Sequence, residues 1–128
     1  MSEDKLTDYS MRFAVATVKL CDTIKHRSVI TNQLLRSATS VGANIREGKY
    51  GSSRADFIAK YQIAAKECYE SEYWLELLMN AEIATKEELG DCLHLCHSLR
   101  RMLAAALNSA KQNLNTGEQK PFGFGNGH

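Results

Sequence analysis

Two cysteines and two histidines lie close together in the last third of the sequence. They are Cys92, His94, Cys96 and His97. Thiolates and imidazoles can ligate zinc, but a structural zinc site needs four converging ligands and usually draws them from two or more segments. Cys92 and Cys96 share one face of a helix, whereas His94 lies on the far side. We therefore interpret the cysteines as small core residues and expect no metal and no cofactor.

Cations cluster in the second quarter of the chain and suggest a different chemistry. Arginine and lysine side chains neutralise phosphates and release counterions, so binding through them weakens steeply with salt. Tyrosines nearby could stack on RNA bases. The candidate nucleic-acid-binding residues are Arg36, Arg46, Lys49 and Arg54.

The charge changes sign between consecutive segments. Residues 25–60 hold seven basic and two acidic residues, and residues 61–85 hold one basic and five acidic residues. Three interpretations stay open: solvated faces in which each charge contributes little, a phosphate-binding patch, or complementarity between copies of the chain that closes a ring. Aromatic residues off the main apolar stripe would suit such a contact between copies. The candidate interface residues are Glu67, Glu70, Tyr73, Trp74 and Glu76.

Small residues line one face of the segment between Ser37 and Asn44. Gly42 lies inside this predicted helix and costs up to ~1 kcal/mol relative to alanine. We expect the close approach of another helix to offset that cost. Asn44 is interpreted as a hydrogen-bonded structural residue, and Glu47 as a partner for a nearby base or for loop amides rather than as a catalytic acid.

Apolar residues recur every three to four positions in four segments, which predicts four amphipathic helices. Ser28 is expected to cap the second helix and Gly48 to end it in the left-handed conformation. Short connections between long helices favour antiparallel neighbours, so the fold class is all-α, an antiparallel up-down-up-down four-helix bundle. The expected helices span about residues 7–25, 29–47, 53–81 and 85–115.

Two further sequence signals mark where the last two helices begin. Ser53 with Asp56 resembles a capping box, and Thr85 with Glu88 is a full one. The bundle is expected to occupy residues 1–116 as a single domain. Residues 117–128 are rich in glycine and lack periodicity, so we interpret them as a disordered tail.

Composition excludes several classes of protein. The 128 residues carry a formal net charge of +1, which gives no overall electrostatic attraction for nucleic acid. The sequence has no long apolar run, so no membrane partner is expected. We do not expect the acidic N-terminal segment to act as a signal peptide, and four cysteines within helical patterns indicate reduced thiols in a cytoplasmic protein. Without catalytic motifs we expect neither an enzyme nor a small-molecule substrate.

A set of residues between Gln33 and Leu78 forms a recognisable pattern: Gln33, Leu34, Arg36, Ser40, Asn44, Ile45, Glu47, Gly48, Ser53, Asp56, Phe57, Ile63, Ala64, Glu72 and Leu75. With these residues the segment resembles the family of small bacterial four-helix proteins encoded in intervening sequences of 23S rRNA genes, also called S23 or four helix bundle proteins. Gly51 departs from the family pattern, which usually has arginine there.

The same fold is similar to that of the accessory protein of diversity-generating retroelements, a barrel-shaped pentamer that binds a reverse transcriptase and nucleic acid. The resemblance therefore implies a homopentamer that associates with RNA. Our expectation is a non-catalytic, ring-shaped binding or scaffold protein whose partners are other copies of itself and RNA or a ribonucleoprotein. The alternatives are a purely structural homo-oligomer, or a protein adaptor, for example for a reverse transcriptase, that does not bind nucleic acid directly.

Overall fold

The protein is all-α in the computed structural model, which describes residues 2–115. This confirms the predicted fold class. The predicted tail over residues 117–128 lies outside the described residues. The four helices are α1 (Ser2–Asp22), α2 (Ser28–Lys49), α3 (Arg54–Asn80) and α4 (Lys86–Asn115).

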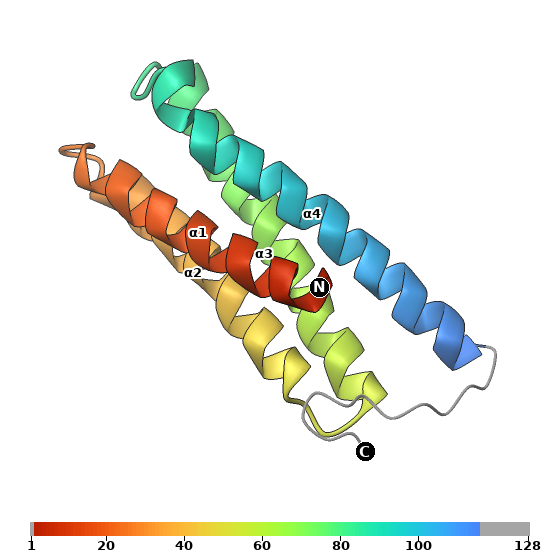
Figure 1. Cartoon of the computed structure of the whole chain (residues 1–128). Helices are drawn as coiled ribbons and strands as arrows, with labels where there is room; N and C mark the ends of the chain where they lie inside the picture. The colour runs from red at the N-terminus through yellow and green to blue at the C-terminus, as the bar shows by residue number, and fades with distance from the viewer. Residues whose placement is uncertain (1, 116–128) are drawn as a thin grey trace.

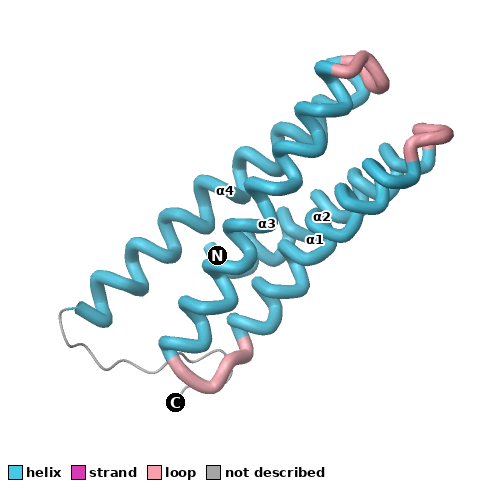
Figure 2. The backbone as a smooth tube through the Cα atoms, turned by 180° about the vertical axis from the view of Figure 1, so that it is seen from behind, coloured by secondary structure: helices cyan, strands magenta, loops and turns pink. Residues whose placement is uncertain are grey.

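The helices form an antiparallel bundle in which each helix packs on two neighbours. Helix α2 packs on α1 and α3, and α4 packs on α3 and α1, whereas the described backbones of diagonally opposite helices stay further apart. The α1–α2 and α3–α4 loops lie together at one end, and the α2–α3 loop lies at the other (Figures 1 and 2). Consequently α1 and α3 run in one direction while α2 and α4 run in the opposite direction.

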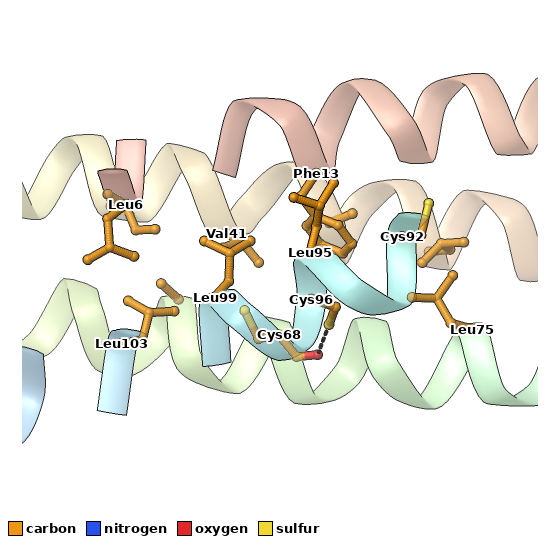
Figure 3. Packing of buried hydrophobic residues seen from close by; sticks show 14 of the residues in the cluster. Leu6, Phe13, Val41, Cys68, Leu75, Cys92, Leu95, Cys96, Leu99 and Leu103 are labelled. Atoms are coloured by element: carbon orange, nitrogen blue, oxygen red, sulfur yellow. Dashed lines mark hydrogen bonds between the residues drawn. The ribbon is translucent and has the colours of Figure 1, made fainter. Parts of the chain in front are cut away.

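One buried face of each helix supplies the core, as the periodicity predicts. Phe13, Leu34, Leu75 and Leu99 come from the four different helices, and all are fully buried. Figure 3 shows how such side chains meet along the axis of the bundle. Burying each large apolar side chain contributes about 1.5–3 kcal/mol, so the four stripes supply the main stabilising term.

Two capping predictions for α2 are wrong. The N-cap residue is Arg27, and no side chain caps the helix, because Ser28 already belongs to the first turn. Gly48 lies inside α2, which continues to Lys49. A Cβ atom on Gly48 would lie 2.8 Å from Cδ1 of Tyr61. Close packing against α3, rather than a left-handed backbone, therefore requires glycine here.

The start signals of the last two helices are confirmed. The Ser53 hydroxyl accepts a 3.1 Å hydrogen bond from the Asp56 amide. At α4, the Glu88 carboxylate accepts from the Thr85 amide at 2.7 Å, and the Glu88 amide donates to the Thr85 hydroxyl at 3.1 Å. This reciprocal pair satisfies two amides that lack partners within the helix. Over the described residues, every helix is too short or too polar to cross a bilayer.

Candidate nucleic-acid and subunit interfaces

Arg36 does not join the other candidate cations but points from α2 toward α3. Its Nη2 lies 2.6 Å from Oε2 of Glu70 and 3.3 Å from Oε1 of Glu67. The Trp74 indole also donates to Glu70 at 3.0 Å. Hydrogen bonds from Arg36 and then Trp74 lower the pKa of Glu70, and those to Glu70 and then Glu67 raise the pKa of Arg36.

This network gives part of the charge split a role within one chain. The basic side of α2 faces the acidic side of α3 in the same molecule, an arrangement that the three sequence interpretations did not include. The Arg36 side chain is 50% exposed, so each ion pair contributes only about 0.2–1 kcal/mol. The pairing links α2 to α3 and occupies two carboxylates that the sequence had predicted to contact another copy.

The remaining candidate cations gather where α2 ends and α3 begins. Arg46 is exposed, and Lys49 and Arg54 are partly exposed. The Lys49 ammonium lies 5.8 Å from the centre of the Tyr50 ring, and Tyr50 is itself 66% exposed. These three cations and the exposed Tyr50 thus lie on either side of the α2–α3 loop at one end of the bundle, away from Arg36.

The acidic residues of this end already have partners. Oε1 of Glu47 lies 3.0 Å from the Lys60 ammonium, which confirms that Glu47 pairs with a nearby base. The Asp56 carboxylate accepts from the hydroxyl and amide of Ser52 at 3.3 and 3.4 Å. The four cations of this end, Arg46, Lys49, Arg54 and Lys60, outnumber the carboxylates of Glu47 and Asp56, so the end of α2 carries a net positive charge. We call its exposed part the α2-end patch: Arg46, Lys49, Tyr50 and Arg54.

The small face of α2 packs against α1 as predicted. A Cβ on Gly42 would lie 3.2 Å from Oγ of Ser10, so glycine allows the two helices to approach closely. The Asn44 amide donates to the carbonyl and hydroxyl of Ser40 at 2.9 and 3.0 Å, which confirms its structural role. Arg46 lines a cavity of about 320 Å³ beside this contact.

The cysteines fill the core, as interpreted. Cys92 and Cys96 are buried, and the Cys96 thiol donates to the Cys68 carbonyl at 3.3 Å (Figure 3). The contact with Cys68 and burial raise the pKa of Cys96, which keeps this thiol protonated and unreactive. The described residues contain no group of three or more histidine, cysteine or acidic side chains arranged to hold a metal ion.

A second polar network, which the sequence did not predict, joins α3 to α4. Oε2 of Glu72 lies 2.9 Å from Nε2 of His97, and its Oε1 lies 3.8 Å from Nε of Arg100. The Arg100 guanidinium also lies 5.3 Å from the centre of the Tyr69 ring. Hydrogen bonding to Tyr69 and the charge of Glu72 raise the pKa of Arg100. The only sequence feature that could have indicated this network is the three-residue spacing of Tyr69 and Glu72, which places both on one side of α3.

Two apolar surfaces have no covering helix in the described part of the chain. On α3, Tyr69 and Tyr73 are 57% and 58% exposed, and Tyr73 packs edge-on against Trp74. Lys66 and Glu76 flank them one turn away on the same side, and we call Lys66, Tyr69, Tyr73 and Glu76 the tyrosine ridge. The predicted interface residues Tyr73 and Glu76 therefore lie on the surface, whereas Trp74 is half-buried.

The other surface lies on α1. Met11, Val15 and Val18 are 53%, 44% and 45% exposed, and we call them the valine stripe. Met11 and Val15 border a groove of about 620 Å³ between α1 and α4, whose floor includes Leu20 and Leu95. Charged residues from both helices line this α1–α4 groove, among them Arg12, Lys19, Glu88 and Asp91.

The comparisons with known proteins agree with this architecture. Residues 3–105 match the family model of the 23S rRNA-intervening sequence protein. A solved structure, of a protein of unknown function from the S23 ribosomal protein family of Bacteroides thetaiotaomicron VPI-5482, is 40% identical with a TM-score of 0.80. The alignment covers 84% of this chain and 99% of that chain. No curated protein matches the sequence.

Proposed function

This chain belongs to the 23S rRNA-intervening sequence protein family, and from that premise we propose that it is a non-catalytic, self-assembling scaffold that binds RNA. The α2-end patch is the proposed RNA contact. The observation that carries the proposal is that Arg46, Lys49 and Arg54 lie at the same end of the bundle as the exposed Tyr50, whose ring centre is 5.8 Å from the Lys49 ammonium.

The chemistry of the α2-end patch suits RNA with unpaired bases. Its guanidinium and ammonium groups can contact phosphates, and a tyrosine that is two-thirds exposed offers a face for base stacking. Stacking on one ring contributes about 1–3 kcal/mol and tolerates any base. A single patch of this size gives weak binding, and assembly of several copies would strengthen it by presenting several patches to one RNA.

Titration of a structured RNA with the whole protein at about 50 mM and about 200 mM salt tests the RNA contact. We expect binding at the lower concentration and marked weakening at the higher one. The double variant Arg46→Glu/Lys49→Glu should lose binding. The matched control is Lys25→Glu, an exposed lysine in the α1–α2 loop at the opposite end of the bundle. Absence of binding by the unmodified protein at low salt would exclude the RNA contact.

A purely structural role is the second candidate, and the bonds from Arg36 to Glu67 and Glu70 favour it. These bonds pair charges of α2 and α3 within one chain, which supports a structural task for these charges. On this alternative the protein assembles but binds no RNA. Sedimentation analysis at micromolar concentration separates the candidates: an assembly without RNA affinity supports the structural role, and a monomer contradicts both.

A further inference from the structure

We propose that the tyrosine ridge of one copy docks on the valine stripe and the edge of the α1–α4 groove of the next copy. The inference rests on the self-assembly proposed above and names the surfaces that carry it. It assigns Lys66, Tyr69, Tyr73 and Glu76 to one side of the contact. The other side is formed by α1, and the occupant of the stripe is a second copy of this chain.

The heights of the two surfaces along the bundle follow from two contacts within one chain. Thr17 lies beside Cys92, with 3.8 Å between Oγ1 and Sγ, and Glu72 lies beside His97. All helices rise about 1.5 Å per residue, and α4 makes one contact with α1 and the other with α3. The two contacts therefore fix the height of each residue of α3 relative to the residues of α1. Tyr73 is consequently level with the turn of α1 that carries the valine stripe.

Apolar groups match at this height. Tyr73 is level with the position between Met11 and Val15, and Tyr69 lies one turn below it on the same side of α3. In a ring whose axis runs parallel to the helices, neighbouring copies sit at equal heights, so these levels are kept between copies. The exposed tyrosine rings would then cover the valine stripe, and the contact would bury apolar side chains that are exposed in the isolated chain.

The charges at both ends of the contact are complementary. Lys66 lies near the height of Asp8, which pairs with Arg12 of its own helix at 3.5 Å, and Glu76 lies at a height between Arg12 and Lys19. These five residues are all exposed on α1 or α3. Individual exposed ion pairs contribute little. Their arrangement nevertheless favours this register, since sliding one copy by about two turns would place Glu76 beside Asp8.

The two surfaces lie on different helices of the protomer. The tyrosine ridge lies on the side of α3 near α4, since the Arg100 guanidinium of α4 is 5.3 Å from the centre of the Tyr69 ring. Met11 and Val15 of the valine stripe border the α1–α4 groove, and Met11 also lines the cavity between α1 and α2. Because the ridge and the stripe are different surfaces, the contact between copies is head-to-tail, and such a contact forms a ring when the rotation at each step closes.

Two surface variants and their mixture test this contact. We expect Val15→Glu and Tyr73→Glu each to sediment as folded monomers, with Val29→Glu and Tyr50→Glu as controls that assemble normally, since both residues are exposed away from the contact. Mixing the two monomeric variants should give a one-to-one dimer and nothing larger. The Val15→Glu variant keeps an intact tyrosine ridge, and the Tyr73→Glu variant keeps an intact valine stripe. Only the contact between these two intact surfaces can form.

Crosslinking gives a second measurement that does not depend on the strength of one contact. A short bismaleimide should join V15C to Y73C in a mixture of those two single variants and should produce a ladder from the double variant. Assembly of Val15→Glu or Tyr73→Glu like the unmodified protein, or absence of the V15C–Y73C crosslink in an assembled sample, would overturn this contact and leave the proposed assembly in place. A monomeric unmodified protein would overturn both.

Discussion

Gly48 and Gly90 both lie inside helices, but only Gly48 is required by packing. A Cβ on Gly48 would meet Tyr61 at 2.8 Å, whereas one on Gly90 would meet nothing within 4 Å. We expect Gly48→Ala to destabilise the protein by about 1–3 kcal/mol through overpacking. Gly90→Ala should stabilise it by about 0.5–1 kcal/mol, because glycine costs that much in a helix. Urea unfolding of both variants measures the difference, and equal effects would contradict the packing argument.

Glu82 occupies a backbone conformation that glycine adopts more readily. Its φ is 59°, and the Glu82 and Ile83 amides donate to the carbonyls of Met79 and Leu78 at 3.0 and 2.9 Å. These bonds form a Schellman motif, whose left-handed residue is usually glycine. The left-handed conformation costs a residue with a side chain about 1–2 kcal/mol, and the extra chain entropy of glycine returns about 0.5–1 kcal/mol of that. Glu82→Gly should therefore raise the free energy of unfolding by about 0.5–1 kcal/mol. Ala59→Gly, at an exposed position within α3, should lower it, and thermal unfolding of both variants provides the comparison.

Burial of the Cys21 thiol makes the folded protein less stable as the pH rises into the alkaline range. Desolvation raises the pKa of this thiol from its ordinary value of 9.0 to about 11. Between these values the unfolded chain has lost the proton that the folded chain keeps. Stability is therefore complete below pH 9.0 and falls as the pH rises toward 11. Chemical unfolding under reducing conditions should show this decrease, and it should be smaller in Cys21→Ala. An identical decrease in both proteins would show that other groups cause it.

At the scale of helices, a buried pair of serines joins α2 to α3. The Ser71 hydroxyl donates to Ser37 at 2.8 Å, and Ser37 donates to the Leu34 carbonyl at 3.1 Å. Ser71→Ala leaves Ser37 with its donor bond intact, so we expect a loss of about 1 kcal/mol. Ser37→Ala removes the acceptor for a buried Ser71 hydroxyl and should cost about 1–3 kcal/mol. Equal losses in denaturant unfolding would contradict this order.

The helices and their core could be predicted because they depend on local patterns. The stripe containing Leu34 and Val41 needs only a period near 3.6 residues, and the Thr85–Glu88 capping box is a local exchange of hydrogen bonds. The structural role of Gly48 could not be predicted, because it depends on the position of the Tyr61 ring of α3 in the packed bundle. The same residue type serves both a left-handed stop and a close helix contact, and sequence spacing does not separate the two.

The candidate site was predicted only in part for the same reason. Arg46, Lys49 and Arg54 share one end of the bundle because they are close in sequence and flank one loop. Arg36 was grouped with them by charge alone. The side of α2 on which it lies is turned toward α3 by the packing of the core, and this brings it to Glu67 and Glu70, which are 31 and 34 residues away in sequence. That pairing depends on the register between two helices, which no local pattern encodes.

At the scale of the whole molecule, we expect different residues to carry RNA binding and assembly. We also expect assembly to raise the affinity for a long RNA. The Val15→Glu variant keeps the α2-end patch, so it should still bind RNA through one copy. An RNA long enough to reach several patches engages an assembled protein at several points, which raises the apparent affinity by about 10²–10⁴ over one patch. The variant should therefore lose that factor with a long RNA and lose little with an RNA that spans one patch. The salt dependence of RNA binding by this variant should also become shallower, by about 0.7–0.9 in logarithmic slope for each phosphate that the protein no longer neutralises.

The variant Arg46→Glu/Lys49→Glu should show the reverse, with normal assembly and no affinity for either RNA. Equal affinity of Val15→Glu and the unmodified protein for the long RNA would mean that the patches of an assembly do not act together, and the RNA contact would then belong to each copy alone.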